Sequence, residues 1–162
     1  MPIIHPIPPV FDSNSRVLIL GSFPSVKSRE AGFFYGHPQN RFWRVLSAVT
    51  GDDPGQTPQS KTAFLLRSHI ALWDVLASCD ITGSADSSIK NAVPNDLSPI
   101  LQTADIRAIF TNGKTADRLY RRLILPQTGV QAICLPSTSP ANAQWSVQQL
   151  TEAWNAQLIR NA

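Results

Sequence analysis

Four short apolar runs, separated by helical patterns, constrain the fold of this chain most strongly. They are RVLILGS (16–22), IALWDVL (70–76), IRAIFTN (106–112) and VQAICLPS (130–137). Each is rich in Val, Ile and Leu and bounded by turn residues, as is typical of strands buried on both faces of a parallel sheet. Helical spacing of apolar residues lies between and after them, at 40–51, from Thr57 onward, at 95–104, at 114–124 and from Ser146 onward. We therefore predict an α/β fold, a three-layer α/β/α sandwich around a central four-stranded, mostly parallel sheet.

The N-terminal stretch MPIIHPIPPVF differs in composition from the rest of the chain. It holds four prolines and neither Lys nor Arg, unlike a signal or transit peptide. We predict an extended arm over residues 1–15 that lies on a single domain over residues 16–162. No apolar run approaches the ~18 residues of a membrane span. We therefore expect no membrane contact, and a monomer in the cytoplasm that is nucleoid-associated in a bacterium.

The cysteines and histidines indicate no metal site. Cys79 and Cys134 each lie in or beside an apolar run, there is no CxxC motif, and the three histidines are scattered. We interpret both cysteines as reduced core residues and expect no metal and no cofactor. The net charge of +3 is compatible with a nucleic-acid partner, although many basic proteins bind none.

Three polar loops follow predicted strands, at the sheet edge where functional loops of such folds lie. They contain GSFPS (21–25), TNGK (111–114) and LPSTSPANA (135–143). None carries the GxGxxG pattern of a dinucleotide site or the lysine pattern of a nucleotide-binding loop. Loops of Ser, Asn, Gly and Pro contact phosphates through backbone N–H groups and hydroxyls.

A fourth stretch, FFYGHPQNRFWRVL (33–46), places aromatic residues, an Asn and an Arg ahead of a helical pattern. With GSFPS before it and LPSTSPANA after it, HPQNRFW resembles the motifs of the uracil-DNA glycosylase superfamily. The similarity is closest to its hypoxanthine-DNA glycosylase group, often called family six, which is related to the mismatch-specific uracil/thymine-DNA glycosylases. It covers roughly residues 16–158, nearly the whole chain.

The resemblance implies a DNA glycosylase acting on double-stranded DNA that contains a deaminated base, hypoxanthine first. Such an enzyme extrudes its target base from the duplex before it cleaves the N-glycosidic bond. The four lysines, Lys27, Lys61, Lys90 and Lys114, read as exposed residues with no environment that depresses their pKa. No Schiff-base lysine is therefore evident, and we expect a monofunctional enzyme.

The chain departs from the mismatch-specific branch at the residue that positions water. Phe23 stands where that branch has an Asn, and Leu135 stands where the classical uracil enzymes have a His. The resemblance to the hypoxanthine group transfers the catalytic amide to Asn40, whose oxygen would hold the water. Asp74 is a second, less certain catalytic candidate, either as water activator or as acceptor from the N1–H of the base.

The resemblance and the loop positions together predict two further sets of site residues. The base-stacking and pocket set consists of Ser22, Phe23, Tyr35 and Asn112. The DNA-binding set, which includes an intercalating loop, consists of Ser25, Lys114, Pro136, Ser137, Thr138, Ser139, Pro140, Ala141 and Asn142.

Structural interpretations of the same residues remain open. Asn40 is also a good helix N-cap. His37, beside Pro38, is typical of a turn histidine, and the Asn112–Lys114 turn is explained equally well as a cap. The alternatives for the function are a mismatch-specific uracil/thymine-DNA glycosylase and a non-catalytic DNA-damage binding module on the same fold.

Overall fold

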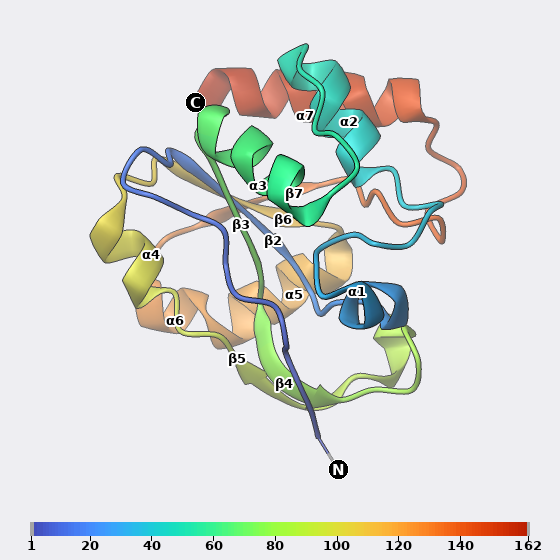
Figure 1. Cartoon of the computed structure of the whole chain (residues 1–162). Helices are drawn as coiled ribbons and strands as arrows, with labels where there is room; N and C mark the ends of the chain where they lie inside the picture. The colour runs from blue at the N-terminus through green and yellow to red at the C-terminus, as the bar shows by residue number, and fades with distance from the viewer. Residues whose placement is uncertain (1, 162) are drawn as a thin grey trace.

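The computed structural model describes residues 2–161 and contains the predicted central sheet (Figure 1). Its strands are β2 (Val17–Gly21), β3 (Ile70–Asp74), β6 (Ala108–Asn112) and β7 (Ala132–Leu135), in the order β3-β2-β6-β7. All three pairings are parallel. The prediction of a four-stranded, mostly parallel sheet is confirmed, and every pairing in this sheet is in fact parallel.

Helices cover both faces of the sheet because successive strand residues point to opposite sides. Val17 and Ile19 face a core built with α2 (Phe42–Thr50), α3 (Pro58–Arg67) and α7 (Val147–Asn161). Leu18 and Leu20 face a second core, with α4 (Ser98–Thr103), α5 (Lys114–Leu123) and α6 (Leu125–Thr128). Figure 1 shows these two groups of helices on opposite sides of the sheet, which confirms the three-layer prediction.

The local signals that predicted the helices are present in the structure. Thr57 caps α3 in a reciprocal pair with Ser60. The Ser146 hydroxyl accepts from the Gln149 N–H at 3.1 Å, and the Gln149 side chain accepts from the Ser146 N–H at 2.9 Å. Gly51 ends α2 in the left-handed conformation, with a φ of 71°. These caps satisfy backbone groups that helix ends leave unpaired.

A second, antiparallel sheet was not predicted from the sequence. It contains β1 (Ile3–Ile4), β4 (Leu76–Asp80) and β5 (Lys90–Pro94), in the order β1-β4-β5. The predicted strand 70–76 is in fact divided, because β3 ends at Asp74 and β4 begins at Leu76. The pairing of β4 with β5 is interrupted by two register shifts, and both strands are partly exposed, so no regular apolar alternation marks them. The short helix α1 (Val26–Ala31) and α6 were also missed.

The N-terminal residues contact both sheets. β1 pairs with β4, and the His5 N–H donates to the Ala77 carbonyl at 2.8 Å. Val10 then bridges Leu72 on β3, the edge strand of the central sheet. Ile7 and Val10 are buried in the core that the first group of helices forms with the sheet. The N-terminal stretch therefore packs against β4 and against β3, the strand that ends at Asp74.

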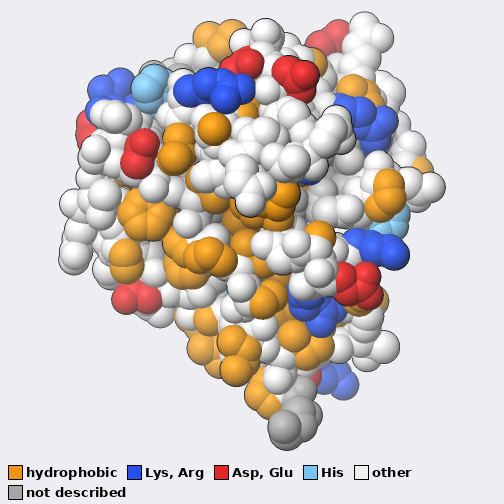
Figure 2. Space-filling model, in the orientation of Figure 1, with side chains coloured by type: hydrophobic (Ala, Val, Ile, Leu, Met, Phe, Trp, Pro, Cys, Tyr) orange, Lys and Arg blue, Asp and Glu red, His pale blue; other side chains and the backbone are white. Residues whose placement is uncertain are grey.

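The surface differs from the sequence-based expectation at one cysteine. Cys79 is buried as expected, but Cys134 is exposed because β7 is the other edge strand of the central sheet, at the opposite side from β3. Figure 2 shows one face of the molecule, on which basic and acidic side chains are dispersed around a more apolar centre. Among residues 2–161, no helix is both long enough and apolar enough to cross a membrane.

Candidate active site

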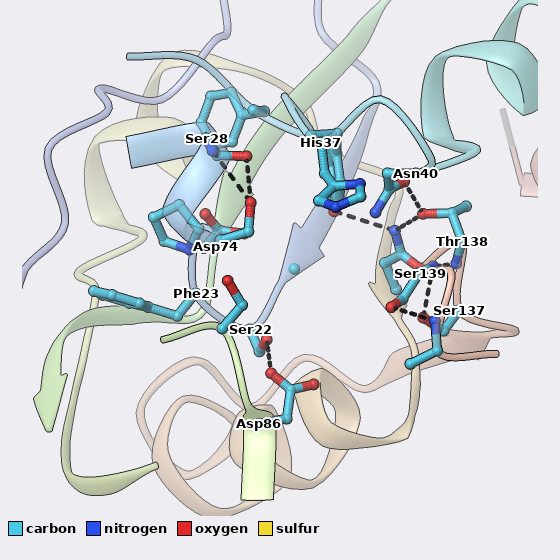
Figure 3. A pocket seen from close by; sticks show the side chains of 18 of the residues that line it. Ser22, Phe23, Ser28, His37, Asn40, Asp74, Asp86, Ser137, Thr138 and Ser139 are labelled. Atoms are coloured by element: carbon cyan, nitrogen blue, oxygen red, sulfur yellow. Dashed lines mark hydrogen bonds between the residues drawn. The ribbon is translucent and has the colours of Figure 1, made fainter. Parts of the chain in front are cut away.

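A pocket of about 330 Å³ lies where the carboxyl ends of the central strands meet the loops (Figure 3). Its floor includes Gly21 at the end of β2, Asp74 at the end of β3 and Asn112 at the end of β6. Its walls come from the loop after β2, from the segment between β4 and β5, and from the loop after β7. This position follows from the parallel topology, which directs all four carboxyl ends to one edge.

The structure brings most of the predicted site residues together in this pocket. Those that line it are Ser22, Phe23, Ser25, Tyr35, Asn40, Asp74, Asn112, Ser137, Thr138, Ser139, Pro140 and Ala141. Three predicted residues do not line it. Lys114 is exposed at the start of α5. The Pro136 carbonyl accepts from the Trp154 indole at 2.9 Å, and the Asn142 side chain donates to the Ser137 carbonyl at 3.0 Å.

Asn40 and Asn112 are joined through Thr138, which is fully buried. The Thr138 N–H donates to Asn112 Oδ1 at 3.1 Å, so Asn112 Nδ2 faces the Thr138 hydroxyl and donates to it at 3.0 Å. That hydroxyl in turn donates to Asn40 Oδ1 at 2.8 Å. Each donor and acceptor is therefore assigned by its neighbour, and the orientation of both amides is fixed.

This network decides which atom of Asn40 is available to a ligand. Asn40 Oδ1 also accepts from the Phe42 N–H, the first of α2, at 3.0 Å. The N-cap residue is Arg41 rather than Asn40, but the Asn40 side chain satisfies this backbone donor while it lines the pocket. Two donors thus occupy the amide oxygen that we had expected to hold water. Asn40 Nδ2 makes no hydrogen bond within residues 2–161. The amide group presents a donor to the pocket rather than an acceptor.

Tyr35 combines an unusual backbone with a buried hydroxyl. Its φ of 52° lies in the left-handed region, which few residues other than glycine adopt. One face of its ring stacks on Phe42, with ring centroids 3.9 Å apart. Its hydroxyl oxygen accepts from Asn112 Nδ2 at 3.2 Å. Burial, and then the charge of Asp74, raise the pKa of Tyr35 far above its ordinary value, so the hydroxyl keeps its proton.

Asp74 lies on the opposite side of the pocket from Asn40 (Figure 3). Its side chain is 5% exposed, and Oδ2 lies 2.7 Å from Nε2 of His5, whose side chain is 3% exposed. Asp74 pairs in register with Gly21 of β2. A Cβ at Gly21 would overlap Asp74 Oδ1 and lie 2.9 Å from the Tyr35 hydroxyl oxygen. Glycine at this position thus lets the carboxylate and the phenol approach the end of β2.

His5 was not predicted as a site residue, because no motif surrounds it. It reaches Asp74 only because β1 pairs with β4, a contact between residues far apart in the chain. His37 also lines the pocket, and its Nδ1 accepts from the Gln39 N–H at 3.1 Å, as a turn histidine does.

The loop after β2 is tied to the segment between β4 and β5. The Ser22 hydroxyl donates to Asp86 Oδ1 at 3.2 Å, and the Val26 N–H donates to the Ser84 hydroxyl at 2.9 Å. Although Asp86 reaches solvent, the pocket walls desolvate its carboxyl and raise its pKa, while the hydrogen bond from Ser22 acts in the opposite direction. Phe23 is held nearby, with its ring perpendicular to that of His5 and the two ring centroids 5.8 Å apart.

Arg41, which was not predicted as a site residue, holds the loop that follows β7. Its guanidinium donates to the carbonyls of Ser139 at 2.8 Å and Asn142 at 3.0 Å, and also to that of Trp145. Its backbone N–H donates to the Thr138 carbonyl at 3.1 Å. The motif order suggested a DNA-contacting loop here, but only the structure shows that the residue after Asn40 fixes its shape.

None of the four lysines lines the pocket. Lys61 differs from the sequence-based expectation, because it is partly buried over the Trp43 ring, 5.1 Å from its centroid. Burial lowers its pKa, so the prediction that no lysine has a depressing environment is wrong for this residue. Within residues 2–161, no three His, Cys, Asp or Glu side chains are grouped to hold a metal ion.

The family model described as the Uracil DNA glycosylase superfamily matches residues 8–158. A Hypoxanthine DNA glycosylase of Methanosarcina acetivorans is 36% identical over 151 residues, which cover 92% of this chain and 94% of the relative. A Hypoxanthine DNA glycosylase of Methanosarcina barkeri is 34% identical over 149 residues, which cover 91% of this chain and 92% of the relative.

Structural similarity agrees with these matches. A solution NMR structure of a Methanosarcina acetivorans protein, described as a "putative Uracil DNA glycosylase", superimposes with a TM-score of 0.80 at 34% identity. The match covers 95% of this chain and 96% of that one. The family model spans nearly the whole chain. The four strands of the central sheet and the residues that line the pocket all lie within the matched residues 8–158. The chain belongs to the Uracil DNA glycosylase superfamily.

Proposed function

We propose that this protein is a monofunctional DNA glycosylase that removes deaminated bases from double-stranded DNA, with hypoxanthine as the preferred base. The observation that carries the proposal is the fixed Asn40–Thr138–Asn112 network, which presents one amide donor to a pocket without lysine. The similarity to two proteins named Hypoxanthine DNA glycosylase supports the choice of base. We further propose that the protein acts as a monomer in the cytoplasm.

The target base has to leave the duplex before it can enter the pocket, at a cost of a few kcal/mol. Pro140 and Ala141 are exposed at the pocket rim, on the loop that Arg41 holds. Compact side chains of this kind suit insertion into the space that the extruded base leaves. Phe23 supplies aromatic surface at the pocket, and stacking contributes about 1–3 kcal/mol per base. The Tyr35 ring already stacks on Phe42, so Tyr35 offers its hydroxyl to the base rather than a ring face.

In the proposed reaction, water adds to C1′ of the deoxyribose and the C1′–N bond breaks. The electron pair of that bond leaves with the base, and the water loses a proton to solvent. Asn40 Nδ2 donates to the oxygen of the attacking water, which leaves a second lone pair of that oxygen directed at C1′. The amide is a weak base, so its contribution is orientation rather than proton abstraction.

The absence of a pocket lysine supports the monofunctional assignment. A bifunctional glycosylase needs an amine that attacks C1′ and forms a Schiff base. Lys61, whose pKa is lowered, borders a neighbouring groove instead and lies against Trp43. We expect an abasic site as the product, with strand cleavage only after alkali treatment.

Single-turnover assays on four duplexes test the proposal. The duplexes carry hypoxanthine, uracil, thymine opposite guanine, or xanthine, and excess enzyme is used before alkaline cleavage. We expect hypoxanthine to be excised fastest. Faster excision of uracil or of thymine opposite guanine would favour the mismatch-specific alternative. Tight binding of a lesion duplex without any abasic product would identify a non-catalytic binding module.

A further inference from the structure

We propose that Asp74 and Tyr35 read the lactam edge of the extruded base, and that His5 from the N-terminal stretch positions Asp74 for this task. A lactam edge is a carbonyl oxygen beside a ring N–H. Deamination creates it from the amino group and ring nitrogen of adenine or cytosine. This inference rests on the proposed function, and it names the chemical feature by which the site selects its substrate.

The hydrogen bonds of His5 define Asp74 as an acceptor. The Ile7 N–H donates to His5 Nδ1 at 3.1 Å, so this nitrogen carries no proton in the arrangement observed. Nε2 therefore carries the ring proton and donates to Asp74 Oδ2 at 2.7 Å. Asp74 Oδ1 receives no hydrogen bond within residues 2–161. It borders the pocket with its lone pairs available to an N–H group.

Tyr35 supplies the matching donor. Its oxygen already accepts from Asn112 Nδ2, and its own proton has no acceptor within residues 2–161. The raised pKa of Tyr35 keeps that proton in place. The hydroxyl oxygen and Asp74 Oδ1 both border the point that a Cβ of Gly21 would occupy. A donor and an acceptor thus lie side by side at the floor of the pocket.

This pair is complementary to the edge that deamination produces. The Tyr35 hydroxyl donates to O6 of hypoxanthine, and Asp74 Oδ1 accepts from N1–H. Adenine presents the reverse pattern, an amino donor and an N1 lone pair. The N1 lone pair would then face Asp74 Oδ1, which is repulsive, and the Tyr35 proton would lose its acceptor. Uracil and cytosine differ in the same way. Guanine carries the lactam edge too, and differs from hypoxanthine in its 2-amino group, so this pair separates deaminated bases from adenine and cytosine only.

His5 acts through Asp74 and is a positioning residue. The Asp74 side chain is only 5% exposed, so its Oδ2 needs a hydrogen-bond donor, and the His5 N–H is the side-chain donor observed within residues 2–161. The histidine is fixed in turn by the backbone N–H of Ile7 and by T-shaped packing against the Phe23 ring. The N-terminal stretch therefore contributes to base selection in addition to covering the sheet edge.

The test compares two duplexes that differ only in the edge of the target base. One carries hypoxanthine, and the other carries unsubstituted purine, which has hydrogen at C6 and a lone pair at N1. Single-turnover excision and equilibrium affinity are measured for both duplexes, and each variant's ratio is compared with that of the unchanged protein. Differences in the intrinsic strength of the two glycosidic bonds then cancel.

We expect the unchanged protein to prefer hypoxanthine by about tenfold or more, as for a good pair of base contacts. Asp74→Ala should bring the ratio of hypoxanthine to purine excision close to the value expected when the edge of the base is not read. Tyr35→Phe should lower this ratio by a smaller amount. His5→Leu should lower the ratio as well. His5→Gln, which keeps an N–H donor at similar reach, should restore most of it. His69→Asn, at the amino end of β3, is the control and should leave the ratio unchanged.

An equal loss of hypoxanthine and purine excision in Asp74→Ala would overturn the inference, because it would place Asp74 in the water step. A ratio that does not differ between His5→Leu and His5→Gln would overturn the role of His5. Thermal melts identify variants that fail to fold, and Tyr35→Phe tests the edge reading independently of Asp74. If the unchanged protein excises neither base, the proposed function fails. The ratio of its affinities for the hypoxanthine and purine duplexes then still decides whether Asp74 and Tyr35 read the edge of the base.

Discussion

Thr138 has no side-chain atom exposed to solvent, and its hydroxyl lies between two side-chain amides. We predict that Thr138→Val, which keeps the shape of the side chain, destabilises the protein by about 1–3 kcal/mol, because buried polar groups lose a partner. Excision of hypoxanthine should fall by about 10- to 100-fold, since Asn40 loses one of the two donors that orient it. Thermal unfolding and single-turnover excision measure the two effects.

Thr111→Val provides the matched control. Thr111 is equally buried, and its hydroxyl donates to Asp117 Oδ1 at 3.0 Å, on the side of β6 away from the pocket lining. Its loss should cost similar stability with little effect on excision. If both variants lost excision to the same extent, the effect of Thr138→Val would reflect stability alone, and the positioning of Asn40 by Thr138 would be contradicted.

Gly21 tests the close approach of the pocket floor to β2. In Gly21→Ala, the added Cβ would overlap Asp74 Oδ1, and Asp74 cannot retreat without leaving His5. We predict that excision becomes undetectable or falls by at least about 100-fold. Gly36→Ala is the comparison, because its nearest neighbour would be a backbone oxygen at 3.3 Å, a contact that a small shift relieves. Circular dichroism should show that both variants remain folded.

At the scale of elements, the loop after β7 depends on α2 for its shape. Arg41, the residue before α2, donates to carbonyls along that loop. We predict that Arg41→Lys loosens the loop, because an ammonium group cannot reproduce the fixed fork of the guanidinium. Excision from duplex DNA should fall more than excision from single-stranded DNA, which requires no wedge. Arg44→Lys, an exposed position on α2, should leave the duplex-to-single-strand ratio unchanged.

The elements that the sequence predicted are those whose signals are local. The four parallel strands are continuous apolar runs, and α3 and α7 begin at capping residues that form the expected hydrogen bonds. β1, β4 and β5 lack such signals because they are short and partly exposed, and their pairing joins segments that are distant in the chain. His5 was missed for the same reason, whereas Asn40 and Thr138 were found through the order of the motifs.

At the scale of the whole molecule, the parallel sheet separates two edges. The carboxyl ends of the strands carry the pocket, and the amino ends carry Arg107, which directly precedes β6. Lys114, which begins α5 with one residue between it and the end of β6, lies on the pocket side of the strand. The net charge of +3 does not come from a tract of basic residues. The position of each Lys or Arg side chain therefore decides whether it can contact a phosphate of the DNA.

We therefore predict that binding to undamaged duplex weakens steeply with salt, and that Lys114→Gln lowers the slope of log K against log[salt] by about 0.9, the value for one phosphate contact. Arg107→Gln removes the same charge at the opposite end of β6. Within residues 2–161 the Arg107 side chain pairs only with Asp105, so the slope of this variant should match that of the unchanged protein. Fluorescence anisotropy at several salt concentrations gives both slopes. Equal changes in the two variants would mean that net charge, rather than the pocket side of the sheet, governs the contact with DNA.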